Sequence, residues 1–258
     1  MSLNVLQNAS KGMVKMEPFP HIILEDALPQ HIYDELESTF PESMMLDGHP
    51  SVNDDRGHTK RYLSYKVLED KVVSQIWQEF FSFHVSDEFY KLVTNDIFSD
   101  AIKSLYPEQA EQIMNTPSLP RQIVNQARSA TPIVTDCQFV MNKPLSENET
   151  SRTPHLDNPV EIYAALLYMK KKDDDSIGGD LQLYESINAD PRLIGKREAD
   201  LSTVRLANSC PYKANSLALF LNCRHGVHGV GSIRNQRSVR RSINIIGEYG
   251  DGRSVFRI

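Results

Sequence analysis

The distribution of apolar residues changes near residue 132, and this change limits the possible folds more than any other feature of the sequence. Before it, apolar residues recur at the spacing of amphipathic helices, as Ile76, Trp77, Phe80 and Phe81 do. After it, short apolar runs alternate with polar turns, at residues 133–141, 160–169, 178–184, 215–221 and 240–248. Regularly spaced short strands are typical of a sandwich, a barrel or a jelly roll. We therefore expect an α+β protein with a mainly β core.

A chain of 258 residues suits one large domain or two small ones. We expect a single domain over residues 1–258, in which the mostly helical residues 1–131 support a β core at residues 132–250. Residues 42–62 are polar and rich in turn residues, so we expect a long surface loop there. The other expected segments are a strand at 21–28, a helix at 29–40, helices over 66–106, a short helix with a connector at 107–131, a polar loop at 142–153, a charged turn at 170–176 and an irregular excursion at 185–212.

Charge and cysteine content narrow the setting in which the protein acts. Lys and Arg total 28 and Asp and Glu total 34, and a net charge of −6 disfavours nucleic acid as a partner. No stretch has the length and apolarity of a membrane span, and residues 1–16 lack the continuous apolar region of a signal peptide. The three cysteines, Cys137, Cys210 and Cys223, are odd in number and widely spaced. That usage favours a reduced, cytoplasmic setting in which each is a small buried residue.

His155 and Asp157 are the first candidate functional residues. In extended backbone, side chains at i and i+2 point to the same side, so the pair could hold one metal ion between them. A pair needs a distant third ligand, and the chain offers His225 or His228. These two are three residues apart, so an extended segment cannot direct both at one ion. The alternative for an isolated His-x-Asp pair is a hydrogen bond at the edge of a strand.

The expected strand at 240–248 has one unusually polar face. Alternation places Arg240, Ser242, Asn244 and Ile246 on that face, and Arg241, Ile243 and Ile245 on the other, which would pack on the helices. A buried arginine needs an anionic partner, and guanidinium matches a carboxylate in a two-pronged arrangement. Arg240 with Ser242 is therefore a candidate carboxylate clamp. The alternative is a solvated basic patch that includes Arg234 and Arg237.

Taken together, these motifs resemble the prolyl-hydroxylase branch of the Fe(II)/2-oxoglutarate-dependent oxygenases, which use two histidines and one carboxylate to hold iron. The resemblance covers roughly residues 133–247. The segments that carry it are His155-Leu-Asp-Asn-Pro159, Leu167-Tyr-Met169, Gly178-Gly-Asp-Leu-Gln-Leu-Tyr184, residues 220–230 and Arg240-Arg-Ser-Ile-Asn-Ile-Ile246.

The resemblance implies a double-stranded β-helix, or jelly roll, braced by the N-terminal helices. Carried over by position, the iron ligands fall on His155, Asp157 and His228, and the 2-oxoglutarate arginine falls on Arg240. Tyr168 and Ser242 would bind the same carboxylate. The gap between His228 and Arg240 is longer than is usual in the family, which leaves Arg241 in reserve. Ile246 replaces a frequent aromatic residue near the cofactor.

The activity implied is hydroxylation of a C–H bond with Fe(II), 2-oxoglutarate and O2, releasing succinate and CO2, with ascorbate as a candidate reductant. The substrate expected from the branch is a prolyl or other amino-acid residue in a protein or peptide. A free amino acid or small metabolite is the alternative substrate. Two other classes stay open: a non-catalytic metal-binding jelly-roll sensor or binding module, and a zinc hydrolase that uses the same three ligands with water.

Overall fold

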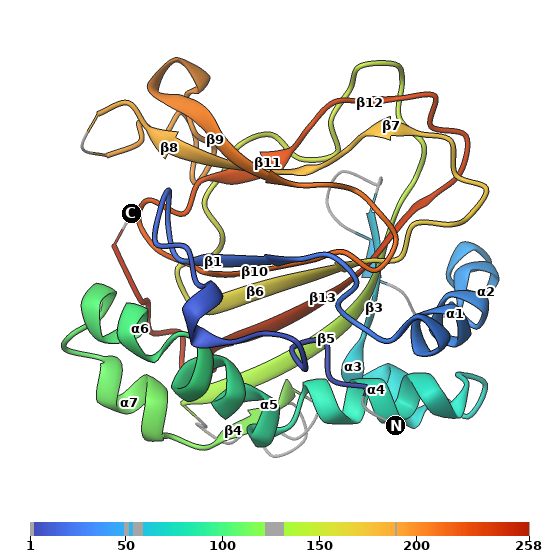
Figure 1. The fold of residues 1–258 in the computed structure, drawn as a ribbon, viewed down its shortest axis with the longest axis horizontal. Coiled ribbons are helices and arrows are strands. Elements are labelled where there is room, and N and C mark those ends of the chain that lie inside the picture. The colour runs from blue at the N-terminus through green and yellow to red at the C-terminus, as the bar shows by residue number, and fades with distance from the viewer. Residues whose placement is uncertain (1–2, 49–51, 54–58, 122–131, 189, 258) are drawn as a thin grey trace.

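The computed structural model describes residues 3–48, 52–53, 59–121, 132–188 and 190–257. Two β-sheets face one another, and most helices cover the side of the larger sheet that is turned away from the smaller one (Figure 1). The N-terminus lies near helix α4, and the C-terminus lies on the side where β8 and β9 are found. The arrangement leaves an inner face on the larger sheet that looks toward the smaller one.

The larger sheet contains eight strands, in the order β1-β10-β6-β13-β5-β3-β2, with β4 paired to β5. Its strands are β1 (His21–Leu24), β2 (Val52–Asn53), β3 (Thr59–Leu63), β4 (Ser118–Pro120), β5 (Ile133–Asn142), β6 (Glu161–Tyr168), β10 (Leu217–Leu221) and β13 (Arg240–Tyr249). All of these pairings are antiparallel except that of β4 with β5. The long strand β13 lies between β5 and β6 at the centre of the sheet.

The register of β13 decides which side chains face the smaller sheet. Ser242 lies opposite Tyr168 on β6 and opposite Val140 on β5. Directly opposed residues share a face, so these side chains belong to the same surface. Ile243 and Ile245 point to the other side and are fully buried in the core with the helices. The two-residue period of β13 was therefore predicted correctly.

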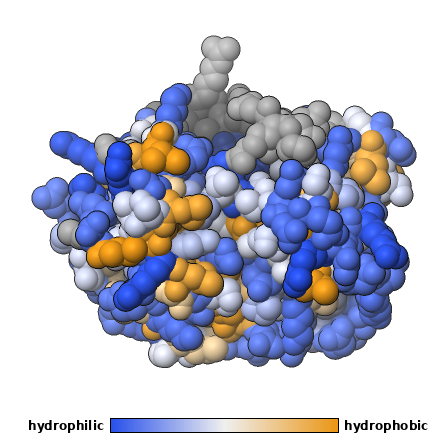
Figure 2. Space-filling view, turned by 90° about the horizontal axis from the view of Figure 1, so that it is seen from above, coloured by the Kyte–Doolittle hydropathy of each residue, from blue (hydrophilic) through white to orange (hydrophobic). Residues whose placement is uncertain are grey.

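The smaller sheet is formed by β11 (His228–Val230), β8 (Leu181–Ser186) and β9 (Val204–Cys210), in that order. A separate pair joins β12 (Ile233–Arg234) to β7 (Ile177–Gly178). Leu181 and Leu183 of β8 are buried toward the larger sheet. Seen from above, the surface on this side is mostly hydrophilic with scattered apolar patches (Figure 2).

The helices pack aromatic side chains against the outer face of the larger sheet. Trp77 is fully buried and meets Phe139 of β5 edge-on at 4.6 Å, and Phe40 at 6.0 Å. Edge-to-face contacts of this kind stabilise a core beyond their buried area. The helices are α1 (Gln30–Ser38), α2 (Glu42–Leu46), α3 (Ser64–Glu69), α4 (Gln75–His84), α5 (Asp87–Lys91), a π-helix (Leu92–Ile97), α6 (Ser99–Leu105), α7 (Ala110–Asn115) and two 3-10 turns (Lys11–Met13 and Leu201–Thr203).

Two sequence predictions about secondary structure were wrong. Residues 42–62 hold α2, β2 and β3 as well as undescribed residues, and β3 joins the larger sheet beside β5. Residues 185–212 contain β9, which pairs with β8. The expected strand at 178–184, entered through two glycines, is present as β8, and Gly178 and Gly179, with φ of 83° and 78°, separate it from β7. Apart from α2, the main helices and the strands at 133–141, 160–169, 215–221 and 240–248 were predicted correctly to within a few residues.

All three cysteines are free and buried, as expected. Among the described residues, no helix combines the length and the apolarity needed to cross a bilayer.

Candidate metal centre

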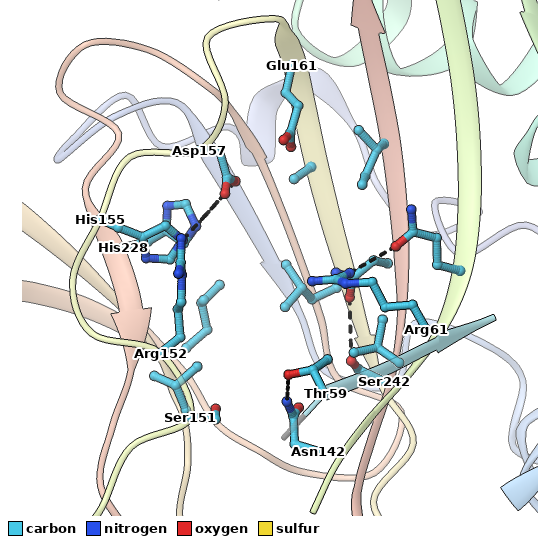
Figure 3. A pocket seen from close by; sticks show the side chains of 18 of the residues that line it. Thr59, Arg61, Asn142, Ser151, Arg152, His155, Asp157, Glu161, His228 and Ser242 are labelled. Atoms are coloured by element: carbon cyan, nitrogen blue, oxygen red, sulfur yellow. Dashed lines mark hydrogen bonds and ion pairs between the residues drawn. The ribbon is translucent and has the colours of Figure 1, made fainter. Parts of the chain in front are cut away.

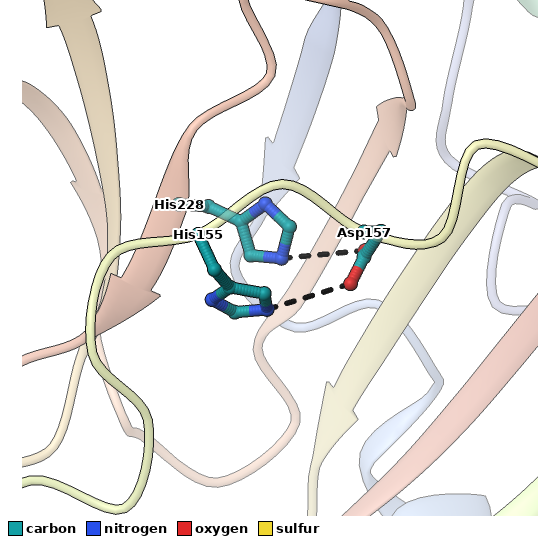
Figure 4. Close-up of side chains that lie close together, drawn as sticks. All are labelled: His155, Asp157 and His228. Atoms are coloured by element: carbon teal, nitrogen blue, oxygen red, sulfur yellow. Dashed lines mark ion pairs between the residues drawn. The ribbon is translucent and has the colours of Figure 1, made fainter. Parts of the chain in front are cut away.

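His155, Asp157 and His228 come together at the edge of the smaller sheet (Figure 4). His155 and His228 exchange backbone hydrogen bonds, N to O, of 2.8 Å and 3.0 Å, which places their rings 4.5 Å apart. The extended backbone at 155–157 then turns the carboxylate of Asp157 toward both rings. His155 Nε2 lies 3.5 Å from Asp157 Oδ1, and His228 Nε2 lies 3.3 Å from Asp157 Oδ2.

The backbone fixes which ring nitrogens are free. His155 Nδ1 lies 2.8 Å from the carbonyl oxygen of Thr153, and His228 Nδ1 lies 2.9 Å from that of Gly226. A proton on each Nδ1 makes both hydrogen bonds, so each Nε2 presents its lone pair to the space beside Asp157. One ligand atom from each of the three residues lies within 4.8 Å of the others. Two imidazoles held in this way with one carboxylate are a donor set that fits a divalent transition metal.

Electrostatics favour the charged form of this carboxylate. Burial alone would raise the pKa of Asp157, but His228 and His155 outweigh it and hold the pKa well below the usual range. Burial lowers the pKa of His155, and the neighbouring His228 lowers it further. For His228 the carboxylate of Asp157 outweighs burial, and the pKa is raised. The cluster therefore supplies an ionised carboxylate and one readily deprotonated imidazole.

The alternative third ligand, His225, lies away from this group. Its side chain is 45% exposed, and its Nε2 is 4.0 Å from Asp190 Oδ1. Of the two histidines that the sequence left open, the structure brings His228 to His155 and Asp157.

Arg240 begins β13 and extends under the smaller sheet. It is 4% exposed, and its guanidinium carbon lies 4.8 Å from the ring centre of Tyr168 and 4.6 Å from that of Tyr212. Arg240 Nη2 donates to the carbonyl of Gly179 at 2.6 Å. The positive φ of Gly179 places that carbonyl, and a Cβ there would come within 3.1 Å of Ile233. Arg240 makes no ion pair with an acidic side chain of the described residues, and its Nε has no partner among them.

Tyr168 and Ser242 lie beside this guanidinium. The hydroxyl of Tyr168 is buried and has no hydrogen-bond partner in the described part of the chain. Burial raises its pKa to about 12 although Arg240 opposes the shift, so the hydroxyl keeps its proton and can donate. Ser242 Oγ is 3.5 Å from Asn244 Oδ1, a long contact. Two buried donors, Arg240 Nε and Tyr168 Oη, are thus left for an anionic group, which fits a carboxylate.

Arg241, the reserve candidate, points to the opposite side of the sheet. It forms ion pairs with Glu37 and, at 3.5 Å, with Glu42, and its guanidinium stacks 4.8 Å from the ring of Phe40. These contacts tie α1 and α2 to the sheet. Arg241 therefore does not line the space in front of the three candidate ligands.

One cavity of about 470 Å³ connects the histidine–aspartate cluster with Arg240 (Figure 3). Its floor is the inner face of β5, β6 and β13, including Ser242, Asn244 and Ile246. The charged residues that line it are Arg61, Arg121, Arg152, Asp157, Glu161, Arg197, Arg240 and Glu248. We call this space the central cavity.

Several of these residues were missed by sequence reasoning. Arg61 lies on a strand in a segment that was expected to be a loop. Tyr212, which contacts Arg240, follows a strand in a segment that was expected to be irregular. Glu161 begins a strand that was predicted, but its side chain gave no sign of facing the cavity. Burial and the charges of Asp157 and Glu248 hold the pKa of Glu161 well above its usual range. The available signal was local: Glu161 is the charged residue in an otherwise apolar run.

Comparison with known proteins is informative only at the level of structure, since no family model and no curated protein matches the sequence. The dioxygenase for auxin oxidation 1 from Arabidopsis thaliana, solved with 2-oxoglutarate, aligns with a TM-score of 0.53 and 12% identity, over 98% of this chain and 91% of that chain. A Pseudomonas putida prolyl-4-hydroxylase aligns with 10% identity and a TM-score of 0.43, over 95% and 96% of the two chains. A Trichoplax adhaerens prolyl hydroxylase, solved with a hypoxia inducible factor peptide fragment, aligns with 14% identity and a TM-score of 0.47, over 97% of this chain and 90% of that chain.

The two likenesses with TM-scores below 0.5 carry no weight. The alignment with the Arabidopsis thaliana dioxygenase spans nearly all of both chains and agrees with the resemblance seen in the motifs. The chain therefore shares the overall fold of this dioxygenase.

Proposed function

We propose that this protein is an Fe(II)- and 2-oxoglutarate-dependent dioxygenase that hydroxylates a C–H bond. The observation that carries the proposal is the joint presence, in one cavity, of the His155–Asp157–His228 cluster and of a buried arginine without an acidic partner among the described residues. A metal site alone would fit many functions. A metal site that shares its cavity with an unpaired guanidinium fits a co-substrate with a free carboxylate.

The three clustered residues would hold the iron on one side and leave its other positions open. Arg240 would bind the distal carboxylate of 2-oxoglutarate, Tyr168 would donate its hydroxyl proton to the same group, and Ser242 would add a third donor. Iron with 2-oxoglutarate supplies the oxidising chemistry: the co-substrate loses CO2 and becomes succinate, and of the two atoms of O2 one enters succinate and the other the substrate. The protein's own part is to orient the co-substrate and to exclude water from the buried end of the cavity.

The finer features of the fold also belong to this proposal. We infer that the two facing sheets form a double-stranded β-helix braced by the helices, and that residues 1–258 make one domain. In support, one cluster of buried side chains includes residues of α1, α4 and α5 together with residues of β5, β6, β10 and β13.

The motifs and the cavity favour two different primary substrates. The motif resemblance favours a prolyl or other amino-acid residue in a protein or peptide, with ascorbate as a reductant. The cavity favours a second candidate, a free amino acid or similar small molecule, because its walls carry several charged side chains. A cytoplasmic setting remains a prediction from the buried, free cysteines.

The two other functional classes, a zinc hydrolase and a non-catalytic sensor, explain fewer features of the structure. A zinc hydrolase would use the three clustered residues but would give no role to Arg240 or to the free hydroxyl of Tyr168. A non-catalytic sensor would keep the cofactor sites without turnover. Both differ from the proposal in what they bind and release.

An anaerobic titration with Fe(II), with and without 2-oxoglutarate, tests the proposal. A weak visible absorption band that needs both additions is expected in the wild type. Asp157→Ala should lose it, and Asp251→Ala, an exposed carboxylate outside the cavity, should keep it. Absence of the band in the wild type, with tight zinc binding instead, would contradict the oxygenase and favour the hydrolase. A band without any 2-oxoglutarate consumption across amino-acid and peptide panels would favour the sensor.

A further inference from the structure

Several charged side chains of the central cavity are used neither by the metal site nor by the carboxylate clamp, and two of these, of opposite sign, reach toward the same space. They are the carboxylate of Glu161, at the start of β6, and the guanidinium of Arg61, on β3. In Figure 3 the two side chains reach toward the same space, with Asp157 on its third side. The positive charges of Arg197 and, next, of Arg61 lower the pKa of Glu161 against the larger effect of burial, but Glu161 forms an ion pair with neither.

The backbone holds Glu161 firmly in place. Its N–H donates to the carbonyl of Asn158 at 2.8 Å, and its carbonyl accepts from Asn222 Nδ2 at 3.0 Å. Its side-chain oxygens, by contrast, have no hydrogen bond or ion pair with any described residue. Burying a carboxylate without a partner costs free energy, because the group loses its contacts with water. A cationic or hydrogen-bonding ligand that contacts Glu161 would recover this free energy.

Arg61 is fixed at one nitrogen only. Its Nη1 donates to Gln138 Oε1 at 2.9 Å, which holds the side chain against the inner face of the sheet. The register of β3 with β5 places Arg61 opposite Val140, which also lines the cavity. The remaining N–H groups of Arg61 have no acceptor among the described residues, so they can bind an anionic group.

A neighbouring set of charges gives the contrast. Arg121 donates to Asp136 at 2.9 Å and to Glu248 at 2.6 Å, and Asp136 also accepts from Ser64 at 2.6 Å. These groups line or support the same cavity but satisfy one another. Glu161 and Arg61 differ from them because each keeps its main binding capacity open.

We propose that Glu161 and Arg61 together bind the primary substrate, and that this substrate is a small zwitterion of the free amino-acid class. Glu161 binds its ammonium group and Arg61 binds its carboxylate. This inference rests on the proposed function, because it takes the cluster and Arg240 as the places of the iron and 2-oxoglutarate.

Cavity size points the same way. A space of about 470 Å³ has to hold 2-oxoglutarate as well as the substrate. Pockets for a single drug-sized ligand run from about 300 to 1,000 Å³, so the second ligand here must be small. The site also lies beside Asp157, where a bound C–H group would be close to the metal (Figure 3).

The test uses the wild-type protein with Fe(II) and 2-oxoglutarate, and measures 2-oxoglutarate consumption with each free L-amino acid. The same amino acids are then tried as Nα-acetyl and as carboxamide derivatives, which each remove one charge, and prolyl peptides with blocked ends are tried beside them. We expect at least one free amino acid to stimulate consumption, and both of its derivatives to lose most of the stimulation.

Two variants assign the charges to residues. For the stimulating amino acid, Glu161→Gln and Arg61→Gln should each raise KM by about thirtyfold or more, because each leaves one charge of a bound pair without its partner. Acetylation of the substrate should raise KM much less in Glu161→Gln than in the wild type. Conversion of the substrate carboxylate to a carboxamide should raise KM much less in Arg61→Gln than in the wild type. Glu79→Gln on α4 and Arg234→Gln on β12, two exposed residues outside the cavity, are the matched controls.

The visible band with Fe(II) and 2-oxoglutarate distinguishes failure of the zwitterion site from failure of the oxygenase function. If the wild type and both variants show the band but no free amino acid stimulates turnover, or only blocked peptides do, the zwitterion site is wrong and the oxygenase stands. If Glu161→Gln keeps the wild-type KM, Glu161 acts as a neutral group and the assignment is also wrong. Absence of the band from the wild type overturns the proposed function itself.

Discussion

Replacing Arg240 is the sharpest test of the proposed 2-oxoglutarate site. The guanidinium is 4% exposed, packs against the rings of Tyr168 and Tyr212, and has no acidic partner among the described residues. Removing one partner of a buried, hydrogen-bonded charge pair costs about 2–5 kcal/mol. For Arg240→Gln this corresponds to a loss of about 30- to 5,000-fold in affinity for 2-oxoglutarate.

Thermal unfolding under anaerobic conditions with Fe(II) provides the assay. At a 2-oxoglutarate concentration 100 times its Kd, the wild type should gain about 2.7 kcal/mol, or about 5–11 °C in Tm for a chain of this size. A thirtyfold weaker variant at the same concentration should gain about 0.9 kcal/mol, or about 2–3 °C. The ligand-free Tm of Arg240→Gln should change little, since the lost ring contacts are offset by removal of a buried, unpaired cation.

Arg241→Gln is the matched control for this experiment. Arg241 pairs with Glu37 and Glu42 on the other side of the same strand, so its loss should lower the ligand-free Tm. The gain in Tm on adding 2-oxoglutarate should stay as in the wild type. If Arg240→Gln keeps the full gain and Arg241→Gln loses it, the clamp has been assigned to the wrong arginine.

Four further predictions concern the metal site and the core. Asp157→Ala should weaken Fe(II) binding at least tenfold in equilibrium dialysis, whereas unchanged binding would remove Asp157 from the site. Metal binding must displace the proton that Asp157 stabilises on His228, so Fe(II) affinity should fall by up to about tenfold per pH unit below the raised pKa of His228; a flat pH profile would argue against His228 as a ligand. In the metal-free protein, folding stability depends on pH in the opposite direction. The contribution of His228 to the free energy of unfolding is complete below its ordinary pKa of 6.5 and is lost as the pH rises through its raised pKa, which a series of thermal melts across this pH range measures. In Gly247→Ala the new Cβ would overlap the ring of Tyr163, so we expect about 1–3 kcal/mol of destabilisation in thermal melts, against no change for Gly12→Ala, which has open space.

The parts of the fold that the sequence predicts are those set by local periodicity. Helix α4 and strand β13 follow from apolar residues at helical and alternating spacing, and both lie where expected. Strand β3 was missed because Lys60 and Arg61 make it look like a polar loop, and only pairing with β5 makes it a strand. Strand β9 was missed because Leu206 on it is 53% exposed, so its apolar residues do not mark a buried face.

The same division holds for the site. His155 and Asp157 could be paired from the sequence because two residues in extended backbone share a side, and this needs no tertiary information. The choice of His228 over His225 depended on a family resemblance, because 71 residues separate it from Asp157 and spacing alone decides nothing. Arg61 and Glu161 reach the cavity, and Tyr212 reaches Arg240, through strand register and sheet packing, which local sequence does not specify.

The polar inner face of β13 is the best functional signal in this chain, and the reason is energetic. A central strand that is covered by another sheet normally carries apolar residues on its inner face, and Arg240, Ser242 and Asn244 depart from that rule. Such groups are retained at a cost unless a ligand satisfies them. The same reasoning extends to Glu161, the charged residue of an otherwise apolar strand on the same sheet face. Polar residues that break the apolar pattern of the central strands therefore mark one side of each ligand position that we propose: Arg240 for a dicarboxylate, and Glu161, facing Arg61 of β3, for a zwitterion.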